Sequence, residues 1–270
     1  MASEAIIDLL GNKTEIEITM EEEFAINSPT PMIVILASYL LIILKIGPEI
    51  MKSRPAFQLK SYIVIYNILQ VLCCIYLVHK VVVINLPTLT FWECAYFQPG
   101  SIEEKDFNHI SYFTFWLKVS ELSETIVFVL RKKQRQVSFL HVFHHCATLF
   151  LVYQLSRTYK GNSALYPLFL NCNVHIIMYC YYLMAAVLPD KIVSKLTPVK
   201  KAITTIQMVQ FALILLQVVV ALSKGCKVPP VILSIYVLII IAFFYMFYDF
   251  YKKNYSSREP LTTKKSEKLI

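Results

Sequence analysis

The sequence predicts an all-α membrane protein with about seven transmembrane helices. Three observations support this fold class: 57% of the 270 residues are hydrophobic, the mean hydropathy is positive, and long apolar runs alternate with charged segments. Water-soluble domains have a smaller apolar fraction. The runs approach the roughly 20 residues with which a helix crosses a hydrocarbon core about 30 Å thick.

The expected helices follow one another with mostly short connections. They cover approximately residues 31–46, 62–83, 110–130, 137–155, 165–188, 203–222 and 231–248. The first run is short, and the third carries charged residues. Because no internal repeat or low-complexity linker divides the chain, we expect one seven-helix membrane domain over residues 31–251. An acidic N-terminal arm (1–30) precedes it and a basic tail (252–270) follows it.

Basic residues lie mainly on one side of the predicted bundle. If the N-terminus is lumenal, the cytosolic segments are 47–61, 131–136, 189–201 and the tail after Tyr251, which together hold 17 of the 26 Lys and Arg residues. The positive-inside rule therefore places the N-terminus in the lumen and the C-terminus in the cytosol. The net charge of +8 reflects the basic residues on the predicted cytosolic side of a membrane protein. Nucleic acid is therefore not an expected partner.

Two features belong to the predicted lumenal side. The arm lacks the basic start and apolar core of a cleavable signal peptide, and its Asn12 begins a three-residue pattern that accepts glycosylation. Cys94 and Cys226 fall in lumenal loops, where the environment is oxidising, and we expect them to form a disulfide. The alternative is two free thiols too far apart to pair.

The third span carries more charge than a lipid-facing helix tolerates. Each ionisable residue deep in a span costs about 2.5–3.5 kcal/mol on insertion scales, and this span contains Lys118, Glu121 and Glu124, followed by Thr125. Residues 118, 121 and 125 share one helical face, where an ion pair between Lys118 and Glu121 would lower the cost of burial. These polar residues either hold neighbouring helices together or form part of a functional site.

Histidines gather near the cytosolic end of the fourth span. His141, His144 and His145 form a patch at i, i+3 and i+4. A single buried histidine, such as His175 in the fifth span, is usually only hydrogen-bonded in the core. Three within five residues favour a site.

Further polar residues accompany these in the fifth and sixth spans. Asn171 and Tyr179 lie one turn before and one turn after His175, and the sixth span adds Thr204, Gln207 and Gln210. We expect all of these groups to face one polar cavity that opens toward the basic cytosolic surface.

These motifs together resemble those of the very-long-chain fatty acid elongases, which are condensing enzymes of the endoplasmic reticulum membrane. The family pattern K-x-x-E-x-x-D-T is similar to residues 118–125, H-x-x-H-H to 141–145, N-x-x-x-H-x-x-M-Y-x-Y-Y to 171–182 and T-x-x-Q-x-x-Q to 204–210. The resemblance covers roughly residues 30–255. One departure is Glu124, where the family has Asp, so we expect altered efficiency with the charge retained.

The resemblance implies a decarboxylative condensation of malonyl-CoA with a long-chain acyl-CoA, which gives a 3-oxoacyl-CoA two carbons longer and releases CoA and CO2. His144 would carry the acyl group, because neutral imidazole is nucleophilic near pH 7. His141, His145 and His175 would orient groups, move protons or stabilise the enolate oxygen, with Asn171 and Gln207 as further donors.

The resemblance also sets expectations for the surroundings of the site. Helices two to seven would enclose an acyl-chain tunnel in the endoplasmic reticulum membrane, and basic residues at the cytosolic mouth would meet the CoA phosphates. Malonyl-CoA is a co-substrate, and no bound cofactor or metal is expected. The cycle implies partners that reduce, dehydrate and again reduce the product: a 3-oxoacyl-CoA reductase, a 3-hydroxyacyl-CoA dehydratase and an enoyl-CoA reductase. A homodimer is left open.

Three other interpretations use the same residues. Cys146, next to His145, could be a nucleophile, but a thiol in an apolar span is usually inert. Membrane desaturases share the H-x-x-H-H box but need about eight histidine ligands for two irons, whereas this chain has six histidines. A transporter or seven-helix receptor also buries Lys, Glu and His, yet the chain shows neither an N-P-x-x-Y motif nor an inverted repeat.

Overall fold

The computed structural model describes residues 28–85 and 92–256. Almost all of the acidic arm (1–30), with the candidate glycosylation site Asn12, and most of the basic tail (252–270) lie outside the described residues.

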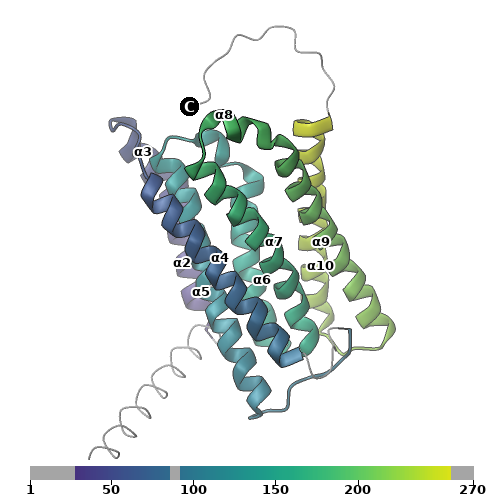
Figure 1. The fold of residues 1–270 in the computed structure, drawn as a ribbon. Helices are drawn as coiled ribbons and strands as arrows, with labels where there is room; N and C mark the ends of the chain where they lie inside the picture. Colours follow the sequence, from purple (N-terminus) through teal and green to yellow (C-terminus); the bar gives the residue numbers. More distant parts are fainter. Residues whose placement is uncertain (1–27, 86–91, 257–270) are drawn as a thin grey trace, which may run out of the picture.

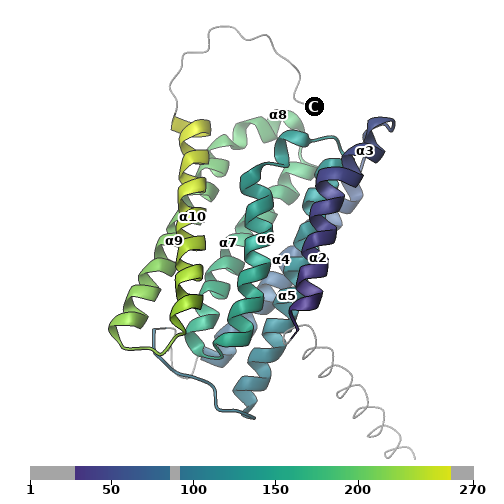
Figure 2. The same cartoon turned by 180° about the vertical axis from the view of Figure 1, so that it is seen from behind.

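The described chain is built of helices (Figures 1 and 2). The long ones are α2 (Pro29–Leu41), which continues through a π-helical turn (Ile42–Ile46) into α3 (Gly47–Lys52), then α4 (Lys60–Asn85), α5 (Ile102–Leu130), α6 (Phe139–Thr158), α7 (Asn162–Val187), α9 (Thr197–Ser223) and α10 (Pro230–Tyr251), with a short α8 (Asp190–Val193) before α9. The pairing of extended backbone in this part of the chain is limited to one bridge, between Tyr96 and Gly161.

Six helices close into a ring. Each contacts the next in the order α4, α5, α6, α10, α9, α7 and back to α4, whereas α2 and α3 lie outside the ring against α5 and α6. Three apolar clusters hold these contacts: one between α2, α3, α5 and α6, one between α4, α5 and α7, and one between α6, α9 and α10. The centre of the ring is therefore separated from the surroundings by one layer of helices.

The outer surface of the helices is apolar, as a surface in contact with hydrocarbon must be. Side chains such as Ile65, Val219 and Leu238 are 58%, 61% and 66% exposed. Among the described residues, five helical segments are long and apolar enough to cross a membrane: 29–52, 60–84, 162–187, 190–223 and 230–255. Helices α5 and α6 fall outside this set. Helix α5 carries Lys118, Glu121 and Glu124, and α6 carries the histidine cluster.

One proline inside a helix has its missing hydrogen bond replaced from a neighbour. Pro167 lies in α7 and has no N–H to donate to the carbonyl of Ser163. Gln217 of α9 donates its Nε2 to that carbonyl at 2.9 Å. In an apolar surrounding an unpaired carbonyl is costly, so this side chain fixes α9 against α7.

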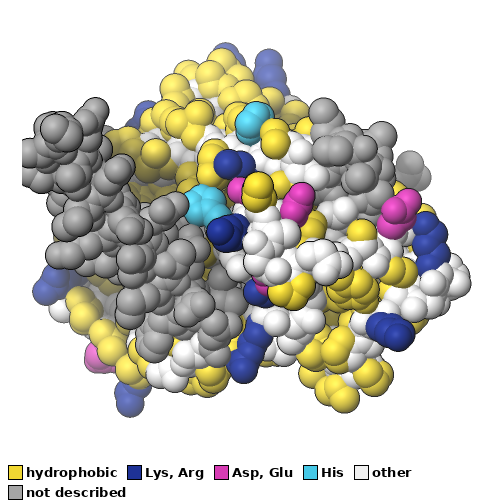
Figure 3. All heavy atoms as spheres, turned by 90° about the horizontal axis from the view of Figure 1, so that it is seen from below, with side chains coloured by type: hydrophobic (Ala, Val, Ile, Leu, Met, Phe, Trp, Pro, Cys, Tyr) yellow, Lys and Arg dark blue, Asp and Glu magenta, His cyan; other side chains and the backbone are white. Residues whose placement is uncertain are grey.

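The end of the bundle remote from α8 is tied together by its loops. Cys94 and Cys226 form a disulfide with a Cα–Cα distance of 5.2 Å, and the Tyr96 hydroxyl donates to the carbonyl of Lys227 at 2.7 Å. A Cβ on Gly161 would lie 2.5 Å from the carbonyl oxygen of Ala95, so the bridge requires glycine there. Figure 3 views this end, where scattered charges are surrounded by hydrophobic flanks.

Candidate active site

A buried ion pair on α5 begins the polar interior. Lys118 Nζ lies 2.8 and 3.0 Å from the two carboxylate oxygens of Glu121, and both side chains are almost fully buried. Lys118 also donates to Asn171 Oδ1 of α7 at 2.9 Å, while His175 Nδ1 of α7 lies 3.3 Å from Glu121 Oε1. The cation thus compensates the carboxylate and fixes the Asn171 amide, which keeps both of its N–H donors for other partners.

Glu124, one turn further along α5, links three other helices. Its Oε1 accepts from the hydroxyls of Tyr66 on α4, at 3.0 Å, and Tyr179 on α7, at 2.5 Å. Its Oε2 lies 3.8 Å from His145 Nε2 on α6. The carboxylate is therefore held by two hydrogen bonds on one oxygen and faces an imidazole with the other.

Thr125 connects α6 to the peripheral helix α2. Its Oγ1 lies 2.9 Å from His141 Nε2 and 2.8 Å from the hydroxyl of Tyr39, which is 3% exposed. Helix α6 begins in this region because Ser138 caps it, accepting a hydrogen bond from the backbone N–H of His141. A chain of polar groups thus runs from outside the ring to the first histidine.

The three histidines of α6 divide between two faces. The rings of His141 and His145, with centroids 4.3 Å apart, turn toward α5. His144 instead packs its ring against Phe243 and Phe247 of α10, at centroid distances of 5.0 and 5.9 Å. A residue three positions after His141 is rotated away from it by about one sixth of a turn, and this rotation directs His144 into the ring of helices.

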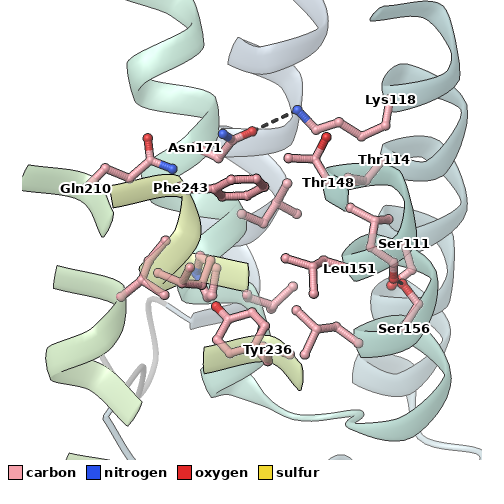
Figure 4. A pocket seen from close by; sticks show the side chains of 18 of the residues that line it. Ser111, Thr114, Lys118, Thr148, Leu151, Ser156, Asn171, Gln210, Tyr236 and Phe243 are labelled. Carbon is pink, nitrogen blue, oxygen red and sulfur yellow. Dashed lines mark hydrogen bonds between the residues drawn. The ribbon is translucent and has the colours of Figure 1, made fainter. Parts of the chain in front are cut away.

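His144 lines a cavity at the centre of the ring, whose empty space is about 780 Å³ including the part that is open to solvent. One end of the cavity is polar, with Lys118 and Asn171, and the walls beyond are mainly Leu, Ile, Val and Phe side chains (Figure 4). A second cavity of about 590 Å³ shares Leu155, Pro167 and Tyr236 with the first and continues to Cys226. Together they provide a long apolar compartment with an imidazole and an amide near one end.

Comparison with known proteins shows the family to which the chain belongs. Residues 24–264 match the sequence profile of the ELO family, described as the GNS1/SUR4 family. The chain is 38% identical over 197 residues to very long chain fatty acid elongase F of Drosophila simulans, covering 70% of this chain and 73% of the relative. It is 30% identical over 237 residues to very long chain fatty acid elongase 1 of Mus musculus, covering 87% and 84%.

The chain belongs to the ELO family. In this ELO-family chain the residues singled out from the sequence occupy two layers. The inner layer borders the cavity and consists of His144, Lys118, Asn171 and Gln210. The outer layer contacts the inner one or braces the helices, and consists of His141, His145, His175, Glu121, Glu124, Thr125 and Tyr179.

Two of the predicted site residues on α9 do not border the cavity. Thr204 donates its hydroxyl to the carbonyl of Lys200 one turn earlier, and Gln207 Nε2 lies 3.8 Å from the sulfur of Met178. Gln210, one turn further on, is the member of this motif that lines the cavity. The structure thus gives the three polar residues different surroundings.

Three tyrosines and a threonine belong to the site but were not predicted from the sequence. Tyr39 and Tyr66 bond to Thr125 and Glu124, and Thr148 and Tyr236 line the cavity. Tyr39, Tyr66 and Tyr236 stand in apolar spans without a charged neighbour in their own helix turn, so their amino-acid type gave no signal. Thr148 lies one turn after His144, and helical spacing could have grouped it with the histidines.

A metal ion could be held by one group of three side chains in the described residues. Glu124, His141 and His145 each place a ligand atom within 4.8 Å of the others. However, Glu124 Oε1 already accepts two tyrosine hydroxyls and His141 Nε2 contacts Thr125. Glu124 Oε2, in contrast, lies 3.8 Å from His145 Nε2.

Proposed function

We propose that this ELO-family chain is a 3-oxoacyl-CoA synthase that elongates long-chain fatty acyl groups by condensation with malonyl-CoA. The observation that carries the proposal is the position of His144, whose ring borders an apolar cavity that the Asn171 amide also lines. A fatty acyl chain fits such a compartment because its hydrocarbon is removed from water over its full length. The names of the relatives support the same substrate class.

In the first step an unprotonated ring nitrogen of His144 attacks the thioester carbon of the acyl-CoA. The carbon–sulfur bond breaks and the acyl group remains on the imidazole, which keeps its other N–H and carries a positive charge, while the CoA thiolate leaves and takes up a proton from the solvent. Packing against Phe243 and Phe247 holds the ring in one orientation and excludes water, which would otherwise hydrolyse the acyl-imidazole.

In the second step malonyl-CoA loses its carboxylate as CO2. The electrons of the broken carbon–carbon bond form an enolate, whose carbon attacks the acyl-histidine carbonyl. The carbon–nitrogen bond then breaks and regenerates neutral His144, and the product is the 3-oxoacyl-CoA. Because Lys118 occupies Oδ1 of Asn171, the amide N–H groups are available to stabilise the developing oxyanion.

The outer layer positions these groups. Glu121 neutralises Lys118 and lies against His175, so that the amide of Asn171 is fixed without an uncompensated charge. Glu124 and Thr125 hold the rings of His145 and His141, which suits these two histidines to passing protons rather than to carrying the acyl group.

The same proposal includes the membrane arrangement. All seven long helical segments cross the endoplasmic reticulum membrane, with the N-terminus lumenal and the C-terminus cytosolic, because the basic segments lie at the α3 and α8 end of the bundle. Helices α5 and α6 cross with their charges directed into the ring. The basic end receives the CoA phosphates, and the three other enzymes of the elongation cycle process the product.

The test is condensation by purified protein in detergent. Supplied with radiolabelled malonyl-CoA and long-chain acyl-CoAs, the wild type is expected to form a labelled 3-oxoacyl-CoA and to release CO2. His144→Ala should abolish the product, whereas His79→Ala, on the exposed side of α4, should retain it. Equal turnover by His144→Ala and wild type, or no turnover by folded wild type, would overturn the proposal.

A further inference from the structure

Within the described residues, Tyr236 carries a buried hydroxyl without a hydrogen-bond partner, and its side chain borders the apolar compartment. The residue lies on α10, is 7% exposed and borders both cavities. In the described part of the chain its hydroxyl has no hydrogen-bond partner. A buried hydroxyl without a partner costs free energy that a phenylalanine at the same place would not cost.

Three other hydroxyls that line the main cavity, in contrast, form hydrogen bonds to the backbone. Thr114, Thr148 and Ser156 donate to carbonyls of their own helices, Ile110, His145 and Val152, at 2.7, 3.1 and 2.7 Å. Their protons are thus committed to the backbone. Tyr236 differs because its proton remains available to whatever occupies the compartment.

The position of Tyr236 on α10 determines how far its hydroxyl lies from His144 along the cavity. Its Cα is seven residues along α10 from Phe243, whose ring contacts that of His144 at 5.0 Å, and seven residues of helix measure about 10 Å. Figure 4 shows Tyr236 at the end of the cavity remote from Lys118 and Asn171. An extended chain with carbon–carbon bonds of about 1.5 Å and angles near 111° advances about 1.25 Å per carbon. Because helical side chains lean toward the helix N-terminus, the hydroxyl is somewhat deeper than the Cα.

We propose that Tyr236 is a binding site for an oxygen atom carried in the middle of the acyl chain, so that the compartment accepts oxygenated acyl groups as well as plain hydrocarbon. The inference rests on the proposed function for the direction in which the chain is bound. An oxo or hydroxyl oxygen about nine to twelve carbons from the thioester reaches the level of Tyr236 and accepts its proton. A saturated chain leaves this proton unpaired.

Binding is the direct test, because it does not require condensation. In a His144→Ala background, which blocks acyl transfer, the dissociation constants of octadecanoyl-, 10-oxooctadecanoyl- and 4-oxooctadecanoyl-CoA are measured with Tyr236 and with Tyr236→Phe. We expect the advantage of the 10-oxo chain over the saturated chain to fall by about 3-fold to 10-fold in Tyr236→Phe, the range for one hydrogen bond. The 4-oxo chain, whose oxygen lies too near the thioester, should show no such change.

Two controls separate this result from loss of structure. Tyr236→Phe should unfold at a temperature no lower than the parent, and Tyr245→Phe, exposed on the same helix, should leave all three constants unchanged. An equal effect of Tyr236→Phe on all three chains, as when the hydroxyl binds only a water molecule, would overturn the inference, as would failure of every acyl-CoA to bind. Failure of wild-type condensation with the 10-oxo preference intact would count against the proposed function alone.

Discussion

Glu124 shows how one methylene group can determine the geometry of a buried site. Its carboxylate accepts from Tyr66 of α4 and Tyr179 of α7, two helices that pack against each other, and approaches His145 on a third helix, α6. The sequence indicated a departure from the family's Asp at this position. In the structure the longer side chain is the one that reaches both tyrosines.

We expect Glu124→Asp to lower activity in this protein, although it restores the family residue. Shortening the side chain by about 1.5 Å stretches at least one tyrosine hydrogen bond, and a bond to a charged group contributes about 1.5–3 kcal/mol. The kcat/KM for condensation should fall about 10-fold or more. Ser123→Ala, at the neighbouring residue, serves as the control, and an Asp variant as active as the wild type would contradict this reading.

Tyr39 is expected to act as a positioning residue although it lies on the helix outside the ring. It hydrogen-bonds to Thr125, which contacts His141, so Tyr39→Phe should lower kcat while leaving KM nearly unchanged. Thr125→Val should lower it similarly, and the two changes together should cost no more than one of them. Tyr62→Phe, which removes an exposed hydroxyl contact to Ser123, is the matched control. Fully additive losses would argue against a shared network.

At this scale the sequence indicated the charged groups, the histidines and Tyr179, but not the tyrosines of α2 and α4. Lys118, Glu121 and Thr125 could be grouped because helical periodicity relates residues within one helix. The partners Tyr39 and Tyr66 are 86 and 58 residues away from the groups they contact. Such pairings depend on which helices become neighbours, which hydrophobic patterning does not encode.

The junction of α7 and α9 shows that a helix interruption can be repaired by a neighbouring helix. Pro167 leaves the Ser163 carbonyl without its usual donor, and Gln217 supplies one. The predicted spans covered the middle of each helix, yet the observed helices extend beyond several of them. Helix α5, for example, begins at Ile102 with a Ser101 cap and acidic residues in its first turn. Polar ends of this kind carry no hydropathy signal.

We expect Gln217→Leu to destabilise the protein by about 1–3 kcal/mol, because it leaves a buried carbonyl unpaired. Pro167→Ala restores the backbone N–H that the carbonyl lacks, so the same Gln217 change should cost less in that background. Thermal unfolding in detergent measures both effects as a double-mutant cycle. Equal losses in the two backgrounds would show that Gln217 does not replace the proline's missing bond.

At the scale of the whole molecule, the loops at one end close the bundle. The Cys94–Cys226 disulfide joins residues separated by 132 positions and connects the loop before α5 to the loop after α9. The sequence indicated the pairing through topology, whereas the order of helices around the ring could not be predicted. Six amphipathic or apolar helices with short loops can close in several ways, and only their packed side chains distinguish these arrangements.

Removal of this disulfide should destabilise the protein by about 2–5 kcal/mol, since it lifts a constraint on a long loop of the unfolded chain. Cys94→Ser, Cys226→Ser and the double variant should unfold at the same lowered temperature, because each breaks the same bond. Cys180→Ser, at a free cysteine of α7, should have little effect. Unfolding temperatures equal to that of the wild type would show that the bond does not contribute to stability.

The central claim is that His144 carries the acyl group at the polar end of an apolar compartment. The most direct measurement incubates the protein with a long-chain acyl-CoA in the absence of malonyl-CoA, followed by acid quenching and mass spectrometry of the peptides. We predict a mass increase equal to one acyl group on His144, lost when malonyl-CoA is added. An acyl group found on Cys146 or His141 instead, or none on a protein that turns over, would contradict the account.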